Sequence, residues 1–248
     1  VILRLTFPIL AVGLAVMAED RGWGLFNNLD IPVWGAALVS MLLLDLAIYL
    51  QHMMFHAVSA LCRLHRMHHA DLDFDATTGL RFHLVEIVIS MAVKLAVVAA
   101  LGLPVFAVLL FEVILNATAP FHHANINLPV SIDRWLRRAV VTPDIHRVHH
   151  SVDPRETNSN YGFNLPWWDR LHGTDVAQPA KVHTEMLIGS EQFRTERDLW
   201  IDRMLVQPIR GSASGHALDI PRQTMTHEEN TLDGKSNEAI VLTNKDKD

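Results

Sequence analysis

Apolar residues are concentrated in the first half of the chain, in four runs separated by short polar stretches. The runs cover residues 1–18, 31–50, 84–101 and 105–121. A helix of roughly 20 apolar residues crosses the hydrocarbon core of a bilayer, although shorter runs also occur in the cores of soluble proteins. Four such runs in one half of a chain favour membrane helices over buried helices of a soluble protein. The pattern therefore predicts about four membrane helices, the last two joined as a hairpin through residues 102–104.

The rest of the chain is polar. Residues 131–141 place basic side chains on one face and apolar ones on the other, as an interfacial helix does. Beyond about residue 208 there is no sustained periodicity, and the composition is typical of disordered segments. We therefore expect a first membrane helix and loop at 1–30, a main helical domain at 31–208 and a polar, disordered tail at 209–248. Because the chain begins with Val1 inside an apolar run, we also expect the first helix to be truncated.

Basic residues indicate the orientation of these helices. The segments that follow the second and fourth runs carry several arginines, namely Arg63, Arg66, Arg134, Arg137, Arg138 and Arg147. The loop at 19–30 carries one arginine and three acidic residues. Positive charge favours the cytoplasmic side of a membrane. The sequence thus predicts an integral, multi-pass membrane protein whose second and fourth helices end at the cytoplasmic face.

Composition excludes several classes of protein and site. The formal charge is −6, with only 21 lysines and arginines, which argues against binding of nucleic acid. The single cysteine, Cys62, excludes a disulfide framework and any cysteine-based zinc or iron–sulfur site. Histidine is unusually frequent, with 15 in the chain. A metal site in this protein would therefore use histidine, with or without carboxylates.

The histidines form clusters near the predicted cytoplasmic helix ends. His52 and His56 are four residues apart, and residues 65–69 and 146–150 both read H-R-x-H-H. Positions i, i+3 and i+4 lie on one helix face, so each cluster can direct its imidazoles to a small volume. Imidazole suits iron, zinc and copper. Eight ligands exceed the three or four of a zinc site, and we therefore expect two metals. With a ninth histidine at the end of the fourth run, the candidate ligands are His52, His56, His65, His68, His69, His123, His146, His149 and His150.

Other polar residues near the clusters have open roles. His83, His122 and His172 are each either additional ligands or unrelated. Asp45 lies inside a predicted membrane span, where a carboxylate is costly and by default a functional candidate. It could orient a ligand, line the substrate path or pair with a neighbouring helix. Ligating histidines usually donate their second N–H to a carboxylate or carbonyl. Candidates for that partner are Asp75, Glu86, Asp144 and Asp169.

The three clusters resemble the three histidine boxes of the fatty acid hydroxylase / sterol desaturase superfamily. The flanking segments 78–83, 121–129, 142–144 and 160–174 are also similar to those of the superfamily, and the resemblance covers about residues 35–205. Two positions depart from the usual pattern, without touching a box. His172 stands where the superfamily usually has Phe, and Leu84 follows His83 where it usually has Pro.

This resemblance implies a membrane helix bundle with a cytosolic helical cap that carries a di-iron centre. It makes residues 31–208 a catalytic domain that uses O₂ to hydroxylate or desaturate an unactivated C–H bond of a lipid. Hydroxylation is the simpler outcome, and we favour it. Because the sequence has no flavin or haem motif, electrons would come from a separate reductase, ferredoxin or cytochrome.

Other kinds of membrane protein fit the histidines less well. A metal-binding or transport protein without oxygenase activity is the alternative, but it would place His and Asp along the membrane midplane rather than at helix ends. A haem cytochrome needs single axial histidines rather than clusters of three. A zinc hydrolase would normally carry an H-E-x-x-H motif, which this sequence lacks.

Overall fold

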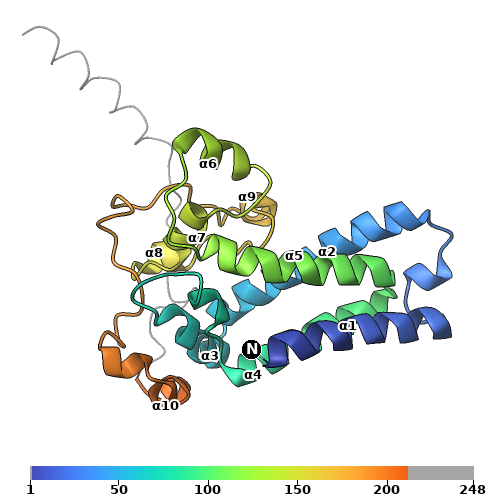
Figure 1. The fold of residues 1–248 in the computed structure, drawn as a ribbon, viewed down its shortest axis with the longest axis horizontal. Coiled ribbons are helices and arrows are strands. Elements are labelled where there is room, and N and C mark those ends of the chain that lie inside the picture. Colours follow the sequence, from blue (N-terminus) through green and yellow to red (C-terminus); the bar gives the residue numbers. More distant parts are fainter. Residues whose placement is uncertain (1, 212–248) are drawn as a thin grey trace, which may run out of the picture.

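Four long helices run side by side at one end of the molecule, and short helices gather at the other end (Figure 1). The structure is a computed structural model that describes residues 2–211. The long helices are α1 (Ile2–Arg21), α2 (Val33–Ala57), α4 (Leu84–Leu101) and α5 (Val105–His122). The short helices, which form the cap, are α3 (Ser59–His69), α6 (Val130–Leu136), α7 (Pro143–His149), α8 (Pro154–Thr157), α9 (Trp167–His172) and α10 (Ile201–Met204). Residues 2–211 contain no β-strand, which confirms the all-α prediction.

The bundle has the surface of a membrane protein. Among the described helices, α2, α4 and α5 are long and apolar enough to cross a bilayer. Their outer faces expose large apolar side chains such as Trp34, Leu38, Phe106 and Val113. The first predicted membrane helix is present as α1, which packs against α4 and α5 but is not among those three.

The hairpin between α4 and α5 turns at a glycine. Gly102 ends α4 with a φ of +62°, a left-handed conformation that glycine adopts without steric cost. A Cβ on Gly102 would lie 2.3 Å from the carbonyl oxygen of Trp23, in the loop between α1 and α2. The backbone N–H of Leu25, in the same loop, donates to the carbonyl of Ala100 at 3.2 Å. The loop and the turn therefore lie at the same end of the bundle, as the predicted topology requires.

All four long helices contribute to one buried apolar cluster. Small residues of α1 meet larger ones of the other three helices in a cluster formed by Ala11, Ala15, Leu44, Ile48, Val98, Leu103, Val108 and Phe111. In lipid, helices associate through close packing and hydrogen bonds rather than through release of water. The small alanines allow α1 to approach the other helices closely.

Helix α2 extends beyond the apolar run. The run ends at residue 50, and the helix continues to Ala57, so His52 and His56 lie one turn apart near its end, as their four-residue spacing predicted. Val58 then adopts an extended conformation, and α3 begins at Ser59. The cap differs from the prediction at one helix. The interfacial helix α6 is shorter than the predicted 131–141. The predicted tail from residue 212 onward lies outside the described residues.

A buried carboxylate ties the bundle to the cap. Asp45 of α2 accepts hydrogen bonds from the Nδ2 of Asn164 at 2.8 Å and from the Nε1 of Trp168 at 2.9 Å. The backbone N–H of Leu165 donates to the same carboxylate at 3.3 Å. Asp45 therefore neither orients a histidine nor pairs with a neighbouring membrane helix. It holds residues 164–168 of the cap against α2.

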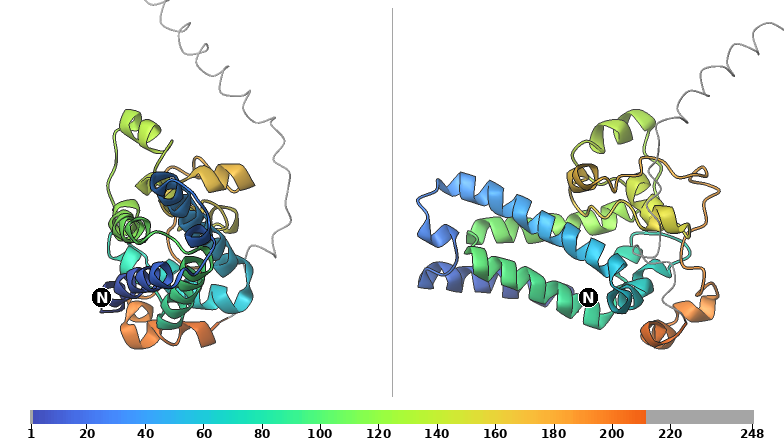
Figure 2. Two further views of the ribbon diagram at one scale, coloured as in Figure 1. Left: turned by 90° about the vertical axis from the view of Figure 1, so that its right-hand side faces the viewer. Right: turned by 180° about the vertical axis from the view of Figure 1, so that it is seen from behind.

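Viewed from behind, α6 and α9 lie on one side of the cap and α10 on the other (Figure 2).

Candidate metal centre

Nine buried histidines meet where the bundle joins the cap, in two groups. One group is His52, His56, His65, His69 and His149, and the other is His68, His123, His146 and His150. Within each group, one ring nitrogen per residue lies within 4.8 Å of those of the other members. These nine are the residues that the sequence singled out as candidate ligands. The structure thus brings the full predicted set together in two groups, each of which could hold a metal ion.

Each H-R-x-H-H motif divides its histidines between the two groups. In α3, His65 and His69 belong to the first group, and His68 belongs to the second. In the motif of α7, His149 belongs to the first group and the other two histidines to the second. Four-residue spacing keeps two side chains on the same face, and the neighbouring position points about 100° away. One turn of helix therefore contributes candidate ligands to both groups.

Hydrogen bonds at Nδ1 determine which tautomer many of these histidines adopt. In four of them Nδ1 faces a backbone carbonyl oxygen, and the pairs are His52 with Tyr161 at 2.8 Å, His68 with Thr78 at 3.1 Å, His123 with Ala119 at 2.7 Å and His149 with Ser159 at 2.7 Å. A carbonyl oxygen only accepts, so Nδ1 carries the proton and the neutral ring presents a bare Nε2. The Nδ1 of His65 faces the carboxylate of Glu86 at 2.6 Å in the same way.

The bare Nε2 atoms point at one another. The distance is 3.1 Å between His52 and His65 and 3.2 Å between His68 and His123. Two nitrogen lone pairs at this distance repel unless a cation lies between them or one ring is protonated. In addition, both ring nitrogens of His69 and of His150 are buried without a hydrogen-bond partner among the described residues. Buried polar atoms are rarely left without a partner. The donor set therefore fits metal ions.

Burial keeps the cap histidines neutral. Removal from water lowers the pKa of His68, His69, His146, His149 and His150 well below the ordinary value of histidine, and the neighbouring imidazoles lower it further. A metal binds the deprotonated nitrogen. The environment thus favours the form of the ring that can act as a ligand.

One of the four predicted carboxylate partners contacts a candidate ligand. Glu86 accepts from His65, whereas Asp75 accepts from the backbone N–H of Thr77. Asp144 forms an ion pair with Arg147 at 3.2 Å. Asp169 accepts from the backbone N–H groups of residues 161 and 162. The Nδ1 partners of His52, His68, His123 and His149 are backbone carbonyls, which a sequence cannot reveal because every residue has one.

The histidines with open roles lie outside the two groups. His122 is fully buried, with its ring 4.3 Å from that of His146 and 4.7 Å from that of Phe163. His83 caps the first turn of α4 by accepting from the backbone N–H of Val85. His172 is exposed and stacks on Tyr49.

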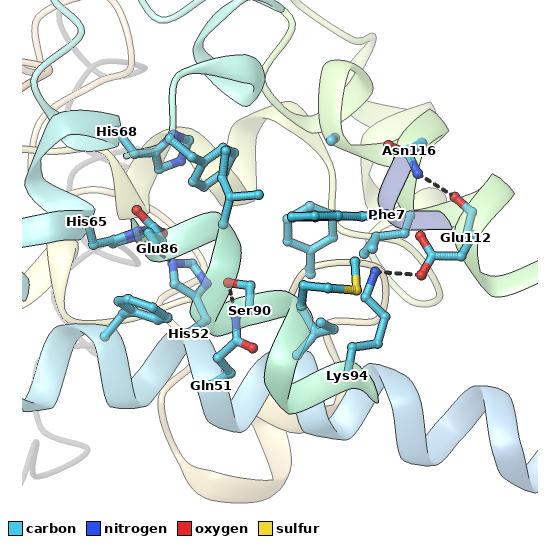
Figure 3. Close-up of a pocket in the computed structure, with 18 of the residues that line it drawn as sticks. Phe7, Gln51, His52, His65, His68, Glu86, Ser90, Lys94, Glu112 and Asn116 are labelled. Atoms are coloured by element: carbon cyan, nitrogen blue, oxygen red, sulfur yellow. Dashed lines mark hydrogen bonds and ion pairs between the residues drawn. The ribbon is translucent and has the colours of Figure 1, made fainter. Parts of the chain in front are cut away.

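A mainly apolar cavity of about 160 Å³ extends from the histidines into the bundle. Side chains of α1, α2, α4 and α5 line it, and Figure 3 shows His52, His65 and His68 at one end. Apolar lining residues include Phe7, Phe55 and Met91. The cavity connects the candidate metal centre with the interior of the membrane helices.

Comparison with known proteins agrees with this site. The sequence profile of the family described as fatty acid hydroxylase matches residues 37–174, which is more than half of the chain. The chain belongs to the fatty acid hydroxylase family. This is a family of non-haem iron oxygenases. No solved structure matches the chain significantly.

Curated relatives of this family member act on lipids. The chain is 26% identical over 155 residues to ornithine lipid hydroxylase OlsE of Rhizobium tropici, covering 62% of this chain and 46% of the relative. It is 29% identical over 174 residues to alkylglycerol monooxygenase of Xenopus tropicalis, covering 68% of this chain and 37% of the relative. The human alkylglycerol monooxygenase is 29% identical over 175 residues, covering 65% and 35%. The chain thus spans less than half the length of these relatives.

Replacing Glu86 by glutamine should weaken the centre without removing a ligand. Glutamine offers His65 an amide instead of a carboxylate, so the ring loses its charged partner. Loss of such a partner typically lowers metal affinity or activity by about 10- to 100-fold. Iron retained after dialysis against a chelator measures the effect. Asp144→Asn is the matched control, because Asp144 pairs with Arg147 rather than with a ligand. Equal iron retention in both variants would contradict the assigned role of Glu86.

Proposed function

We propose that this protein is a membrane-bound, O₂-dependent oxidoreductase that hydroxylates an unactivated C–H bond of a lipid at a centre of two iron ions. The observation that carries the proposal is the pair of histidine groups whose bare Nε2 atoms converge at one end of a mainly apolar cavity. A metal held there would lie beside a lipid chain that enters the cavity. The nine histidines of the two groups are the proposed ligands.

The ligand set suits this chemistry. Neutral imidazoles suit iron and leave the charge of a bound ion uncompensated, which keeps the ion electrophilic. Bound iron would supply the O₂ activation, because protein side chains alone do not carry that reaction. The chain itself holds each ring in one tautomer through Tyr161, Thr78, Ala119, Ser159 and Glu86. It also keeps the histidines buried and places the lipid against them.

Features of the chain and the names of its relatives support proposals for the remaining components of the reaction. The printed names of the relatives are hydroxylase and monooxygenase, which supports hydroxylation over desaturation. The electrons would come from a separate reductase, ferredoxin or cytochrome. The arginines that follow α2 and α5 support a cytoplasmic position for the metal centre and its electron donor.

Metal content per chain tests the proposal. The protein is purified in detergent from iron-replete cells and analysed for iron, zinc and haem. We expect about two irons per chain, in line with one ion per histidine group, without a haem absorbance band. Lipid profiling with and without the enzyme then identifies an oxygenated product. Haem would indicate a cytochrome. Absence of tightly held iron, or iron without any oxygenated lipid, would favour a metal-binding or transport protein.

A further inference from the structure

The cavity has a second polar end, which the metal centre does not explain. Lys94 of α4 and Glu112 of α5 lie among its lining residues, and Nζ of Lys94 is 2.5 Å from the carboxylate of Glu112 (Figure 3). Both residues are on helices apolar enough to span a membrane, and they are only 6% and 3% exposed. Ionisable residues at such positions are costly and usually functional. The presence of Lys94 and Glu112 is therefore explained either by a bound ligand or by a structural role.

Two further polar side chains lie along the same cavity. Gln51 of α2 donates through Nε2 to the hydroxyl of Ser90 on α4 at 2.7 Å. Its Oε1 atom is buried and has no hydrogen-bond partner among the described residues. Asn116 donates to the backbone carbonyl of Glu112, one turn earlier in α5, and also lines the cavity. In Figure 3 Gln51 and Ser90 lie between the histidines and the Lys94–Glu112 pair. The polar groups thus follow the path that a lipid would take.

The spacing of residues along α4 gives the distance between the two polar ends of the cavity. Glu86 contacts the ligand His65, and Lys94 lies eight residues farther along the same helix. At 1.5 Å per residue this separation is about 12 Å. A lipid whose reacting carbon lies beside the histidines would place a group about 12 Å away next to Lys94 and Glu112.

The charges indicate which group fits. Lys94 and Glu112 neutralise each other, so a ligand with a full charge would remain uncompensated in a low-dielectric region. The ammonium of Lys94 has three donor hydrogens, whereas Glu112 and the Oε1 of Gln51 offer acceptors. A hydroxyl group both donates and accepts. We infer that Lys94 and Glu112, together with Gln51 on the side nearer the histidines, form a binding site for an uncharged hydroxyl group of the lipid substrate, with the ion pair about 12 Å farther along α4 than Glu86. This inference rests on the proposed function, because it takes the cavity to be the lipid site.

Equilibrium binding of short amphiphiles tests the site without requiring turnover. The probes are radiolabelled 1-dodecanol, dodecane and dodecanoate, offered to the iron-loaded full chain in nanodiscs. We expect 1-dodecanol to bind about tenfold more tightly than dodecane, the effect of roughly one hydrogen bond. Dodecanoate should bind more weakly than the alcohol. Equal binding of alcohol and alkane, or tighter binding of the carboxylate, would overturn the inference.

Variants separate a binding site from a structural ion pair. In Lys94→Met/Glu112→Leu both charges are replaced together, which leaves no uncompensated charge. We expect this variant to bind dodecane as before and to lose the preference for the alcohol. An unchanged preference would mean that the pair only joins α4 to α5. Gln51→Leu leaves the ion pair intact and should also reduce the preference, so it decides the matter if the double variant does not fold. Ser40→Ala is the control, because Ser40 is a buried polar residue of the same helix that does not line the cavity.

Separate measurements test the proposed function and the hydroxyl-binding site. Iron content and lipid oxygenation are measured on the same preparations. An alcohol preference that depends on Lys94 and Glu112, found in protein that never oxygenates a lipid, would support the binding site and contradict the oxygenase. Oxygenation of a lipid without any preference for the alcohol would support the oxygenase and contradict the binding site.

Discussion

The His149→Ala variant is expected to hydroxylate lipid at least about a hundredfold more slowly than the unaltered chain. The Nε2 atom of His149 is buried among four other histidines of its group, and Nδ1 is held by the carbonyl of Ser159. Alanine removes one proposed ligand and leaves the carbonyl without its donor. Product formation and iron content of the purified variant measure the effect.

Insertion into the membrane should be unchanged in this variant, since His149 lies in the cap rather than in α2, α4 or α5. His172→Ala is the matched control, because His172 is an exposed histidine that stacks on Tyr49 and lies outside both groups. It should retain turnover and iron. Full turnover in His149→Ala would exclude the third histidine cluster as a ligand set.

The Asp45→Ala variant is expected to lose about 3 kcal/mol or more of folding stability. The substitution removes the acceptor for Asn164, Leu165 and Trp168, and a buried donor left without a partner costs about 1–3 kcal/mol. The cap should then separate more readily from α2 and release bound iron. Limited proteolysis of the cap and denaturant titration in detergent measure these changes.

Two further variants test whether the loss of stability comes from the buried acceptor of Asp45. Asp45→Asn keeps one acceptor oxygen of the same shape and should recover part of the stability. Asp30→Ala removes an exposed carboxylate from the loop before α2 and should have little effect. Protease resistance of Asp45→Ala equal to that of the unaltered chain would show that the contact does not hold the cap in place.

The positions of the long helices and of the histidines could be predicted because each has a direct signal in the sequence. The apolar run at 84–101 coincides with α4, and Gly102 marks its end through a backbone conformation that favours glycine. The spacing within the two H-R-x-H-H motifs predicted that the histidines of each motif lie close together. The four-residue spacing of His52 and His56 likewise predicted that the second helix continues past its apolar run.

The contacts that position the ligands could not be predicted, because most involve groups that every residue has. The acceptors for His52 and His68 are the carbonyls of Tyr161 and Thr78, whose side chains say nothing about this role. Asp45 was recognisable as costly, but its partners lie more than a hundred positions later in the chain. Lys94 is a charged residue within the apolar run at 84–101, and only the structure pairs it with Glu112.

Division of each H-R-x-H-H motif between the two histidine groups has a consequence for how the centre acquires metal. If the centre holds two ions as proposed, an ion bound by His65 and His69 would also restrict the turn of α3 that carries His68. The loss of conformational entropy in that turn would then occur only with the first ion, and a second ion would bind residues already held in place. Metal uptake should accordingly be cooperative, with a sigmoidal titration curve. An average content of one ion per chain would then describe a mixture of fully loaded and empty molecules rather than a population of half-filled sites.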